Sequence, residues 1–565
     1  MSTSTETPAA TPAGSRSGRE VALDYARRMF ERQRVALPPL GFRVDWADQP
    51  SRHKLYLDAV TLPLPETFAT MPEVAVDDAA LAAGDLVSSA MPSLDLVTSM
   101  LGCYGLIGRR TEPNWNEDST RKLRADGAVW ARPTASGGGM YPAESYLVAG
   151  PGAPLPTGIY HYDTAHHGLD RLSVADRTAD VGAACGIDAA LYLVATLRFW
   201  KNAFKYNSFS YHVVTQDVGA LLGSWRLVLG AHSLAAEPAL WFDDAAVASV
   251  LGVDGRSEAP FVVLPLGPRT PHVDPPGDPI RLGRRPGGVE HHRVWERSAR
   301  VRSFDLVEQA HAAALVGTGP RPLPVPPETV VPTEMRGDVV DLPAPAAAPD
   351  ELDLRESLRR RRSSFGLLSS RPPLSLDDLG WVLSATERAG RAGTDVAPAP
   401  REPWTRLGVL PGAVDGLEQR AYAYERHRLV GAGPVDVGAL QRHYALTNYN
   451  LREVAAVLVI TGRLEPLVDA YGARGYRMLS IEVGQAAQAT YLAATARRLG
   501  VGAVLGIDNL AVDALLGVDQ TDEHSMLFIL LGHERTGHAG YDHALHPRHA
   551  LHPPRRTAPD EGTPR

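Results

Sequence analysis

A block of sequence that recurs once, at a constant spacing of 265 residues, restricts the possible folds of this chain more than any other feature. The segment that begins at Leu193 aligns without a gap with the segment that begins at Leu458, and Gly219 then matches Gly484. Arrays of small repeats have periods of about 20–50 residues, so one copy at a domain's distance indicates that a whole domain was duplicated. We therefore expect two related domains that pair as an internal pseudo-dimer.

Each copy of the block shows the same succession of secondary structure. Apolar strands are predicted over Leu191–Leu197 and Ala455–Thr461, and a long helix follows each of them. In the second copy, Gln485–Leu499 has small residues at helical spacing, which is typical of a helix packed closely against its neighbours. A last strand follows at Pro260–Leu266 and at Ser525–Leu531. Helices that cover sheets in this way predict an α+β layer architecture.

Length and composition place the boundaries of the domains. At 565 residues the chain is too long for one compact core, and Pro-rich and Gly-rich stretches lie in its middle and at its ends. Such stretches form linkers or tails, because Pro and Gly interrupt helices and strands. The sequence predicts a disordered tail over 1–18, a first domain over 19–267, a Pro-rich linker over 268–350, a second domain over 351–536 and a disordered tail over 537–565. A short helix is expected inside the linker, from Ser303 to Val316.

Charge and cysteine content exclude several classes of function. A net charge of −8 gives no general attraction to nucleic acid or to an anionic membrane. The two cysteines, Cys103 and Cys185, have no CxxC spacing, which argues against disulfide scaffolds, cysteine zinc sites and iron–sulfur clusters. No apolar run approaches the roughly 18 residues that span a bilayer. We expect a cytoplasmic protein that binds neither nucleic acid nor membrane and holds no metal.

The two copies differ in one segment that could contact a ligand. The first half contains ARPTASGGGMYPAESYLVAG from Ala131, whose glycines let the backbone approach a planar or anionic ligand and whose Thr134 and Ser136 offer hydroxyl groups. The second half has PREPWTRLGVLPG in the same place. A Gly-rich loop is often only a turn, but its loss from one copy favours a specific role in the other.

Two further segments carry candidate chemistry. The second half contains LRESLRRRRSSFG from Leu354, whose guanidinium and hydroxyl groups suit a phosphate. The alternative is a solvated basic helix end, which the helix dipole favours. In the first half Lys205 precedes Tyr206, and the second half has no lysine there. A lysine can lower the pKa of a neighbouring phenol and make it a usable base. The alternative is a surface lysine beside a core tyrosine.

Together these segments resemble the nitroreductase-like flavoprotein superfamily, and within it the SagB/ThcOx-type dehydrogenases of thiazole/oxazole-modified peptide biosynthesis. The resemblance covers roughly 44–267 and 352–532, and includes DWADQPSRHKLY and MLGCYGLIGRR. The family pattern R-P-[ST]-x-S-G-G-x-x-Y-P-x-E is met by Arg132, Pro133, Thr134, Ser136, Gly137, Gly138, Tyr141, Pro142 and Glu144. The arginine motif departs from the family's R-R-S-x-R-x-F, which leaves the register of the phosphate ligands open by two residues.

The resemblance implies one FMN site between two fused nitroreductase-like domains. The loop residues Arg132 to Gly138 would face the flavin from the first domain. The second domain would contribute Arg360, Arg362, Ser363, the turn residue Gly506 and Arg535. Lys205 and Tyr206 match the family's catalytic pair, in which Tyr206 is the base that takes a ring proton while a hydride passes to the flavin. Because the second half lacks the Gly-rich loop, we expect one complete site per chain.

The function implied in this way is oxidation of thiazoline or oxazoline rings to azoles in a ribosomally synthesised, post-translationally modified peptide, as part of natural product biosynthesis. Its partners would be the modified precursor peptide and a YcaO-type cyclodehydratase. Two alternatives remain open. One is an NAD(P)H-dependent nitro or quinone reductase, or another small-molecule flavin oxidase. The other is a flavin-free scaffold that binds a peptide. The Lys205–Tyr206 pair favours the azoline dehydrogenase, because an ordinary nitroreductase needs no dedicated base.

Overall fold

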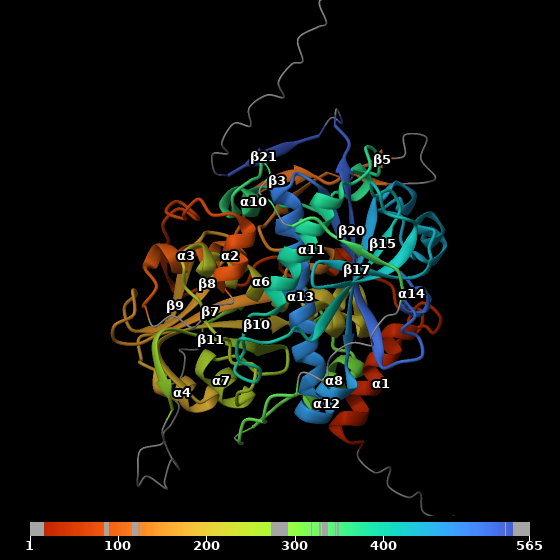
Figure 1. The fold of residues 1–565 in the computed structure, drawn as a ribbon. Helices are drawn as coiled ribbons and strands as arrows, with labels where there is room; N and C mark the ends of the chain where they lie inside the picture. The colour runs from red at the N-terminus through yellow and green to blue at the C-terminus, as the bar shows by residue number, and fades with distance from the viewer. Residues whose placement is uncertain are drawn as a thin grey trace, which may run out of the picture.

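The computed structural model shows an α+β arrangement in which helices pack between and around two large antiparallel sheets (Figure 1). It describes residues 16–83, 90–115, 123–125, 127–272, 292–317, 319–326, 329, 337–344, 346, 348, 350–536, 538 and 540–545. Among the described residues, no helix has both the length and the apolar character needed to cross a membrane.

The first large sheet has six strands in the order β11-β10-β7-β8-β9-β2, and every neighbouring pair is antiparallel. Its strands are β2 (Val60–Pro63), β7 (Ala143–Ala149), β8 (Gly158–Asp163), β9 (Gly168–Ser173), β10 (Ile187–Arg198) and β11 (Glu258–Pro271). The central strand β10 is apolar along most of its length, which is why it lies between two neighbours in the middle of the sheet.

The second large sheet has eight strands in the order β13-β17-β16-β15-β18-β20-β14, with β19 also paired to β20. Its strands are β13 (Val339–Asp341), β14 (Leu368–Ser369), β15 (Thr405–Pro411), β16 (Arg420–Glu425), β17 (Arg428–Pro434), β18 (Ala456–Arg463), β19 (Gly500–Val504) and β20 (Glu523–Glu534). Six of them follow the same neighbour order as the first sheet, from β20 and β18 through β15, β16 and β17 to β13.

Individual side chains repeat between the two sheets as well. The Oγ1 of Thr196 donates a hydrogen bond to buried Glu258, and Thr461 bonds Glu523 in the same way 265 positions later. The helices α7 (Asp244–Leu251) and α14 (Asn509–Leu516) differ by that same spacing at both ends. The repeat in the sequence is therefore a repeat of strand order, helix position and buried polar bonds.

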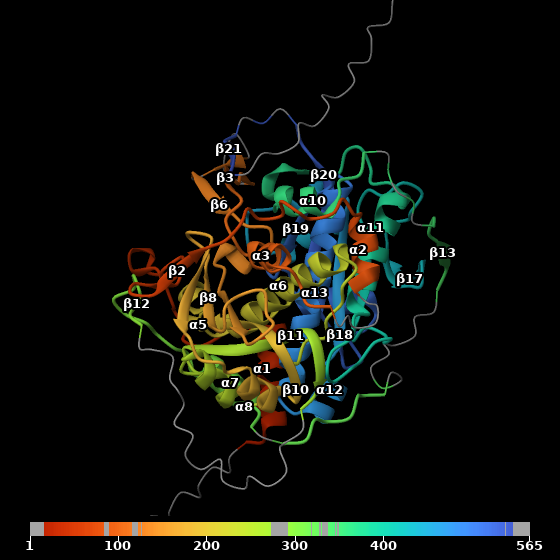
Figure 2. The same cartoon turned by 90° about the vertical axis from the view of Figure 1, so that its left-hand side faces the viewer.

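Two long helices, α6 (Ser210–Ala231) and α13 (Arg474–Ala496), cross in the centre of the molecule between the two sheets (Figure 2). A Cβ on Gly219 would lie 2.0 Å from the carbonyl oxygen of Ile481, and a Cβ on Gly484 would lie 2.0 Å from that of Gln216. Only glycine lets the two backbones approach this closely. The crossing also joins one buried apolar cluster that includes residues of both halves.

The N-terminal helix α1 (Gly18–Glu31) packs over this crossing. Ser17 and Glu20 form a capping box at the N-terminus of this helix. Its Tyr25 ring meets the rings of Tyr211 and Tyr476 edge-on, at centroid distances of 5.7 and 5.5 Å. These two tyrosines are equivalent positions of the repeat, so α1 contacts both halves at once.

The remaining helices and strands are short. The helices are α2 (Val76–Ala83), α3 (Leu94–Gly102), α4 (Thr178–Cys185), α5 (Phe199–Tyr206), α8 (Asp305–Ala313), α10 (Leu354–Arg360), α11 (Leu376–Gly390) and α12 (Glu465–Tyr471). The 3-10 turns are η1 (Trp46–Asp48), η2 (Gly137–Gly139), η3 (Asn207–Phe209), η4 (Phe365–Leu367), η5 (Val437–His443) and η6 (Leu451–Glu453). Three small sheets pair β1 (Leu55–Tyr56) with β12 (Val294–Trp295), β4 (Asn114–Trp115) with β5 (Leu123–Arg124), and β3 (Gly108–Thr111) with both β6 (Ala128–Ala131) and β21 (Asp542–Ala544).

Two segments differ from the expectation, and a third agrees with it. The helix expected over Gln485–Leu499 begins earlier, at Arg474, because the polar residues of its first turns are buried by the other half. Residues 542–544, expected in a disordered tail, form β21 against β3. The helix expected inside the linker is present as α8, whereas most of 273–291 and 327–336 and the tails 1–15 and 546–565 lie outside the described residues.

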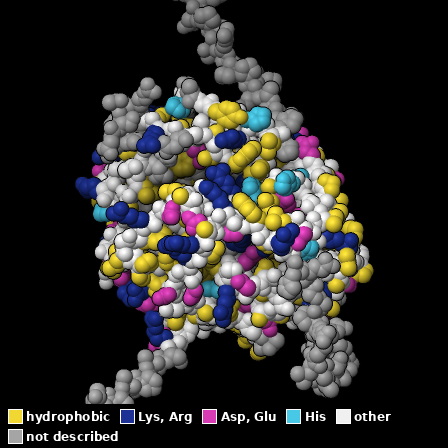
Figure 3. Space-filling view, turned by 180° about the vertical axis from the view of Figure 1, so that it is seen from behind, with side chains coloured by type: hydrophobic (Ala, Val, Ile, Leu, Met, Phe, Trp, Pro, Cys, Tyr) yellow, Lys and Arg dark blue, Asp and Glu magenta, His cyan; other side chains and the backbone are white. Residues whose placement is uncertain are grey.

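The face of the molecule seen from behind mixes basic, acidic and apolar side chains (Figure 3). No single charge sign covers this face, which agrees with a modest net charge of −8.

Candidate active site

A cavity of about 1040 Å³ opens beside the helix crossing and is lined by both halves of the chain. The first half contributes the glycine loop Ser136–Gly139, the end of α5 and one side of α6, and the second half contributes α13, β19 and the turn at Leu505–Gly506. The volume lies at the upper end of the range for ligand pockets, roughly 300–1,000 Å³. It can therefore hold a cofactor together with part of a substrate.

The glycine loop is held against α6 by Asp217. The carboxylate of Asp217 accepts hydrogen bonds from Ser136 Oγ and from the backbone N–H of Gly137, both at 2.7 Å. The Ser136 Oγ in turn accepts the backbone N–H of Tyr141 at 2.8 Å. The loop therefore has a fixed shape before any ligand binds.

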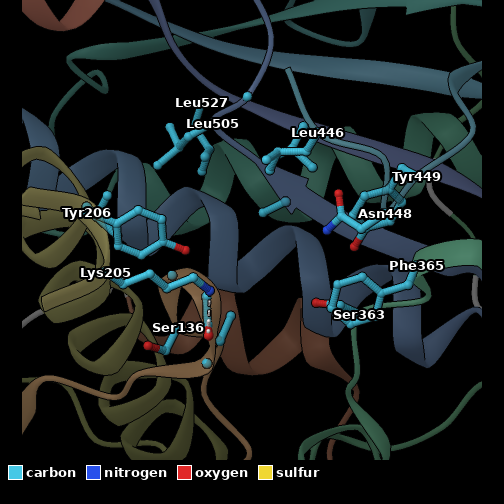
Figure 4. A pocket seen from close by; sticks show the side chains of 18 of the residues that line it. Ser136, Lys205, Tyr206, Ser363, Phe365, Leu446, Asn448, Tyr449, Leu505 and Leu527 are labelled. Atoms are coloured by element: carbon cyan, nitrogen blue, oxygen red, sulfur yellow. Dashed lines mark hydrogen bonds between the residues drawn. The ribbon is translucent and has the colours of Figure 1, made fainter. Parts of the chain in front are cut away.

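The Lys205–Tyr206 pair, at the C-terminal end of α5, touches this loop inside the cavity (Figure 4). A Cβ on Gly138 would lie 2.1 Å from the hydroxyl of Tyr206 and 2.6 Å from the amine of Lys205. The amine also donates to the carbonyl oxygen of Gly138 at 3.5 Å. Gly138 has a φ of +64°, so both its conformation and its surroundings require glycine. Sequence analysis placed these residues in one site, and the structure brings them into contact.

The electrostatics of the pair differ from the expectation. The sequence predicted that Lys205 lowers the pKa of Tyr206, but burial raises the pKa of Tyr206, and the negative charge of Asp217 raises it further. Burial also lowers the pKa of Lys205. Burial raises the pKa of Asp217 itself to about 7, although the bonds from Gly137 and Ser136 act in the opposite direction. The fold thus favours a neutral phenol and makes the neutral amine of Lys205 easier to form.

A cluster of buried polar side chains, Lys201, Glu144 and His161, holds α5 in place. The Nζ of Lys201 donates to the carbonyl oxygen of Arg52 at 3.0 Å and lies 3.4 Å from a carboxylate oxygen of Glu144. Glu144 also bonds His161 at 3.2 Å. Arg52 belongs to the DWADQPSRHKLY segment, so this motif anchors the helix that carries the Lys–Tyr pair.

Ser363 of the second half lies at the opposite end of the cavity (Figure 4). Arg361, two residues earlier, also lines the cavity. Arg361 is only 3% exposed, and its Nη2 donates to the carbonyl oxygen of Arg132 at 3.0 Å. Its Nε has no hydrogen-bond partner among the described residues. An unpartnered buried guanidinium N–H beside a hydroxyl suits a phosphate oxygen, so these two residues fit the phosphate of FMN.

The other predicted arginines lie outside the cavity lining and hold ion pairs. Arg360 pairs with Glu356 four residues earlier, Arg362 Nε donates to Glu534 at 3.0 Å, and Arg535 lies 3.0 Å from Glu453. In the run of four, Arg360 and Arg362 thus hold ion pairs, Arg359 lies 3.8 Å from Glu66, and Arg361 is the side chain at the cavity. Arg361 is the residue after α10, where the backbone leaves the helix, and no regular spacing in the sequence distinguishes it.

Arg132, Pro133 and Thr134 lie behind the loop and not on the cavity surface. The guanidinium of Arg132 stacks over the ring of Tyr141 at 4.4 Å, and Thr134 Oγ1 donates to the carbonyl oxygen of Cys103 at 2.8 Å. The carbonyl oxygen of Pro133 accepts a bond from Gln488 of the second half at 3.3 Å. These residues support the loop from the core, while Ser136, Gly137, Gly138 and Gly506 line the cavity directly.

Sequence reasoning missed the contribution of the segment after α1. Gln33 donates to the carbonyl oxygen of Gly506 at 3.0 Å, Arg32 bonds that of Leu505, and Arg34 lies 3.2 Å from Asp508. Three consecutive residues thus hold the turn that the resemblance places at the flavin ring. Arg32 and Gln33 also line the cavity, and no motif in the sequence signalled that role.

The equivalent place in the other half is filled by the chain's own side chains. Leu240 and Trp241 correspond to Leu505 and Gly506, and their backbone N–H groups donate to the carboxylate of Asp395 at 2.8 and 3.2 Å. Arg226 corresponds to Tyr491 and bonds the carbonyl oxygen of Gly393. Asp395 and Arg226 are both buried, so in this half the two backbone N–H groups are bonded to the chain itself.

Comparisons with known proteins agree with this fold. Residues 372–533 match the model of the nitroreductase family. A protein of Methanocaldococcus jannaschii that carries the name nitroreductase is 32% identical over 174 residues, which cover 30% of this chain and 84% of that protein.

One solved structure shows the same architecture over most of the chain. The crystal structure of a protein named as a nitroreductase from Anabaena variabilis has a TM-score of 0.66 and 22% identity, and covers 91% of this chain and 99% of its own. A chain of the E. coli microcin synthetase McbBCD complex overlaps in part, with a TM-score of 0.26, 17% identity, 45% of this chain and 94% of its own. The first of these establishes a likeness of fold over nearly the whole molecule.

Proposed function

The chain belongs to the nitroreductase family, a family of flavin oxidoreductases, and we propose that it is an FMN-dependent dehydrogenase that oxidises thiazoline or oxazoline rings of a modified peptide to azoles. The observation that carries the proposal is the contact of Lys205 and Tyr206 with Gly138 inside a cavity that also contains Arg361 and Ser363. A basic pair is needed to remove a ring proton, whereas simple reduction of a nitro group needs none.

Arg361 and Ser363 would hold the phosphate of FMN, and the glycine loop would face its ring system. Bound FMN would supply a two-electron acceptor. Arg360, Arg362 and Arg535 were also predicted to bind the cofactor, and their ion pairs with Glu356, Glu534 and Glu453 give them a different role in the proposal. They would fix the backbone around Arg361, and Arg361 would make the direct contact with the phosphate.

The residues of this chain would manage the proton. Tyr206 would take the ring proton at its hydroxyl oxygen while its own proton passes to the neutral amine of Lys205. Both groups lie against Gly138, and burial, which lowers the pKa of Lys205, favours that neutral amine. This order of events removes the need for a free phenolate, which the raised pKa of Tyr206 opposes.

We also propose that residues 19–267 and 351–536 are duplicated domains that form an internal pseudo-dimer with one complete site. The shared strand order and the reciprocal glycine contacts of α6 and α13 support the duplication. The filling of the second place by Asp395 and Arg226 supports a single site. Purified protein should therefore bind one FMN per chain at saturation, and a stoichiometry of two would contradict this part of the proposal.

Mass spectrometry of an azoline-bearing peptide tests the activity. The protein with bound FMN, visible by its absorbance near about 450 nm, should remove about 2 Da per ring. The variant Tyr206→Phe should keep FMN and lose this conversion. Turnover of nitro compounds or quinones with NAD(P)H, without any change in peptide mass, would instead establish the reductase. Colourless protein that does not bind added FMN would contradict the proposal and support a flavin-free scaffold.

A further inference from the structure

Asp217 is a buried carboxylate in the middle of α6 that no family motif quoted above includes. It lines the cavity and is 5% exposed. Its two hydrogen-bond partners among the described residues, Ser136 Oγ and Gly137 N–H, are both neutral donors in the glycine loop. A carboxylate in such surroundings is expensive to bury unless a cation neutralises it.

The repeat supplies an internal comparison at Glu482, which lies 265 positions after Asp217 on α13. Glu482 accepts the backbone N–H of Thr405 at 2.8 Å and its Oγ1 at 3.1 Å, so it also holds a segment that leads into a sheet. The side chain of Glu482 forms a buried ion pair with Arg401. Both halves therefore contain a buried carboxylate that holds a neighbouring segment through two hydrogen bonds. Only the carboxylate of the second half has a cationic partner, Arg401.

The groups around Asp217 do not replace that cation. Asp217 raises the pKa of the phenols of Tyr104 and Tyr206, which face it from the segment after α3 and from α5. Lys205 also lies at the loop, where its amine donates to Gly138 and forms no ion pair with Asp217 among the described residues. The chain thus keeps an uncompensated carboxylate at the cavity, although the other half shows that a compensated one fits this fold.

We propose that Asp217 is a positioning residue that holds Ser136 and Gly137 so that Gly138 stays pressed against Lys205 and Tyr206, at the expense of the stability of the chain. This inference rests on the proposed function for its catalytic consequence. An ionised carboxylate accepts from both donors at once, whereas an amide of the same shape has one accepting oxygen and one donating nitrogen. Loss of the charge therefore releases one bond of the loop and relieves the buried charge.

The variant Asp217→Asn tests the proposal, with Glu482→Gln as the matched control. At pH 8 we expect Asp217→Asn to raise the Tm by about 1 to 3 °C, because relief of the buried charge outweighs one lost neutral bond. Glu482→Gln should lower the Tm, because it leaves Arg401 buried without its partner. Azoline turnover by Asp217→Asn should fall at least about 10-fold in kcat with little change in KM, since the loop positions groups for the chemical step.

Hydrogen exchange separates this inference from the proposed activity. Amides of residues 134–141 should exchange faster in Asp217→Asn than in the parent, whether or not the protein oxidises azolines. A lowered Tm for Asp217→Asn would show that the carboxylate stabilises the fold. Unchanged hydrogen exchange of residues 134–141 would show that the carboxylate does not hold the loop. Either result would overturn the proposal. Failure of the parent to oxidise any azoline, with the Tm and exchange results as expected, would overturn the proposed function alone.

Discussion

Substitution of Gly138 by alanine tests the contact on which the proposed chemistry depends. The new methyl carbon would lie 2.1 Å from the hydroxyl of Tyr206 and 2.6 Å from the amine of Lys205. Carbon atoms rest at about 3.5–4.0 Å from their neighbours, so the two side chains must retreat by about 1 Å or more. The φ of +64° adds about 1 to 2 kcal/mol of backbone strain for a residue with a Cβ.

A displacement of about 1 Å in a catalytic group can reduce the rate about 100-fold. We therefore expect Gly138→Ala to lower kcat for azoline oxidation by about two orders of magnitude. The assay is the rate of mass loss from an azoline peptide at saturating FMN, with flavin binding followed separately by fluorescence. The phosphate end of the cavity lies away from Gly138, so FMN affinity should change much less than kcat.

Gly139→Ala is the matched control, because Gly139 has nearly the same φ, +67°, and its Cβ would have no protein atom within 4 Å. Gly152→Ala, with a φ of +88° and open space, controls for strain outside the cavity. All three variants should lose a similar small amount of Tm. If Gly138→Ala keeps the parental kcat, or if Gly139→Ala and Gly152→Ala lose as much kcat, the contact with the Lys–Tyr pair does not limit the reaction and the reasoning is refuted.

Three further predictions follow from other contacts. Arg361→Gln should weaken FMN binding about 10- to 100-fold in a fluorescence titration, since charge-assisted hydrogen bonds contribute about 1.5–3 kcal/mol. Arg362→Gln should weaken FMN binding less, and equal losses in the two variants would show that Arg361 does not hold the phosphate. Gly484→Ala should lower the Tm by several degrees in a thermal melt, because a Cβ 2.0 Å from the carbonyl oxygen of Gln216 outweighs the roughly 1 kcal/mol gain in helix propensity; an unchanged or raised Tm would contradict the close crossing. Because the pKa of Asp217 is raised from its usual 3.8 to about 7, the fold favours the protonated form, and the contribution of Asp217 to stability falls as pH rises from about 4 to about 7. The Tm advantage of Asp217→Asn should therefore be small at pH 5 and larger at pH 8. A difference in Tm that stays constant with pH would show that the charge of Asp217 is not responsible.

The repeat made much of the architecture predictable. A spacing that stays at 265 residues from Gly219 to Gly484 requires two copies of one unit, and apolar runs such as Leu191–Leu197 fix its central strands. Small residues in α13 correctly indicated close helix packing. These features are local, so periodicity and composition are enough to recognise them.

The resemblance also selected several of the residues that line the cavity. Ser136, Gly138, Lys205, Tyr206 and Ser363 come from distant segments and line one space. Contiguous motifs identified these residues because their backbone requirements, above all the glycine conformation, leave a mark in the sequence. Their catalytic and cofactor roles stay predictions until the variants above are measured.

Other features depended on the tertiary structure. Four adjacent arginines look alike in a sequence. Their acidic partners Glu66, Glu356 and Glu534 show which of them are paired and leave Arg361 at the cavity. Glu356 is on the same helix as Arg360, but Glu66 and Glu534 lie in distant segments of the chain, so no local pattern could assign them.

The ionisation of the buried groups likewise depended on the tertiary structure, whereas other properties could be recognised in the sequence. The sequence alone showed the repeat at 265 residues, predicted the α+β class and showed the loss of the Gly-rich loop from one half, because each can be recognised in consecutive residues. It could not determine that the pKa of Tyr206 is raised, because burial depends on every segment packed around the phenol. Nor could it show that the fold brings Arg401 to Glu482, whereas Asp217, at the same position of the repeat, has no ion pair among the described residues.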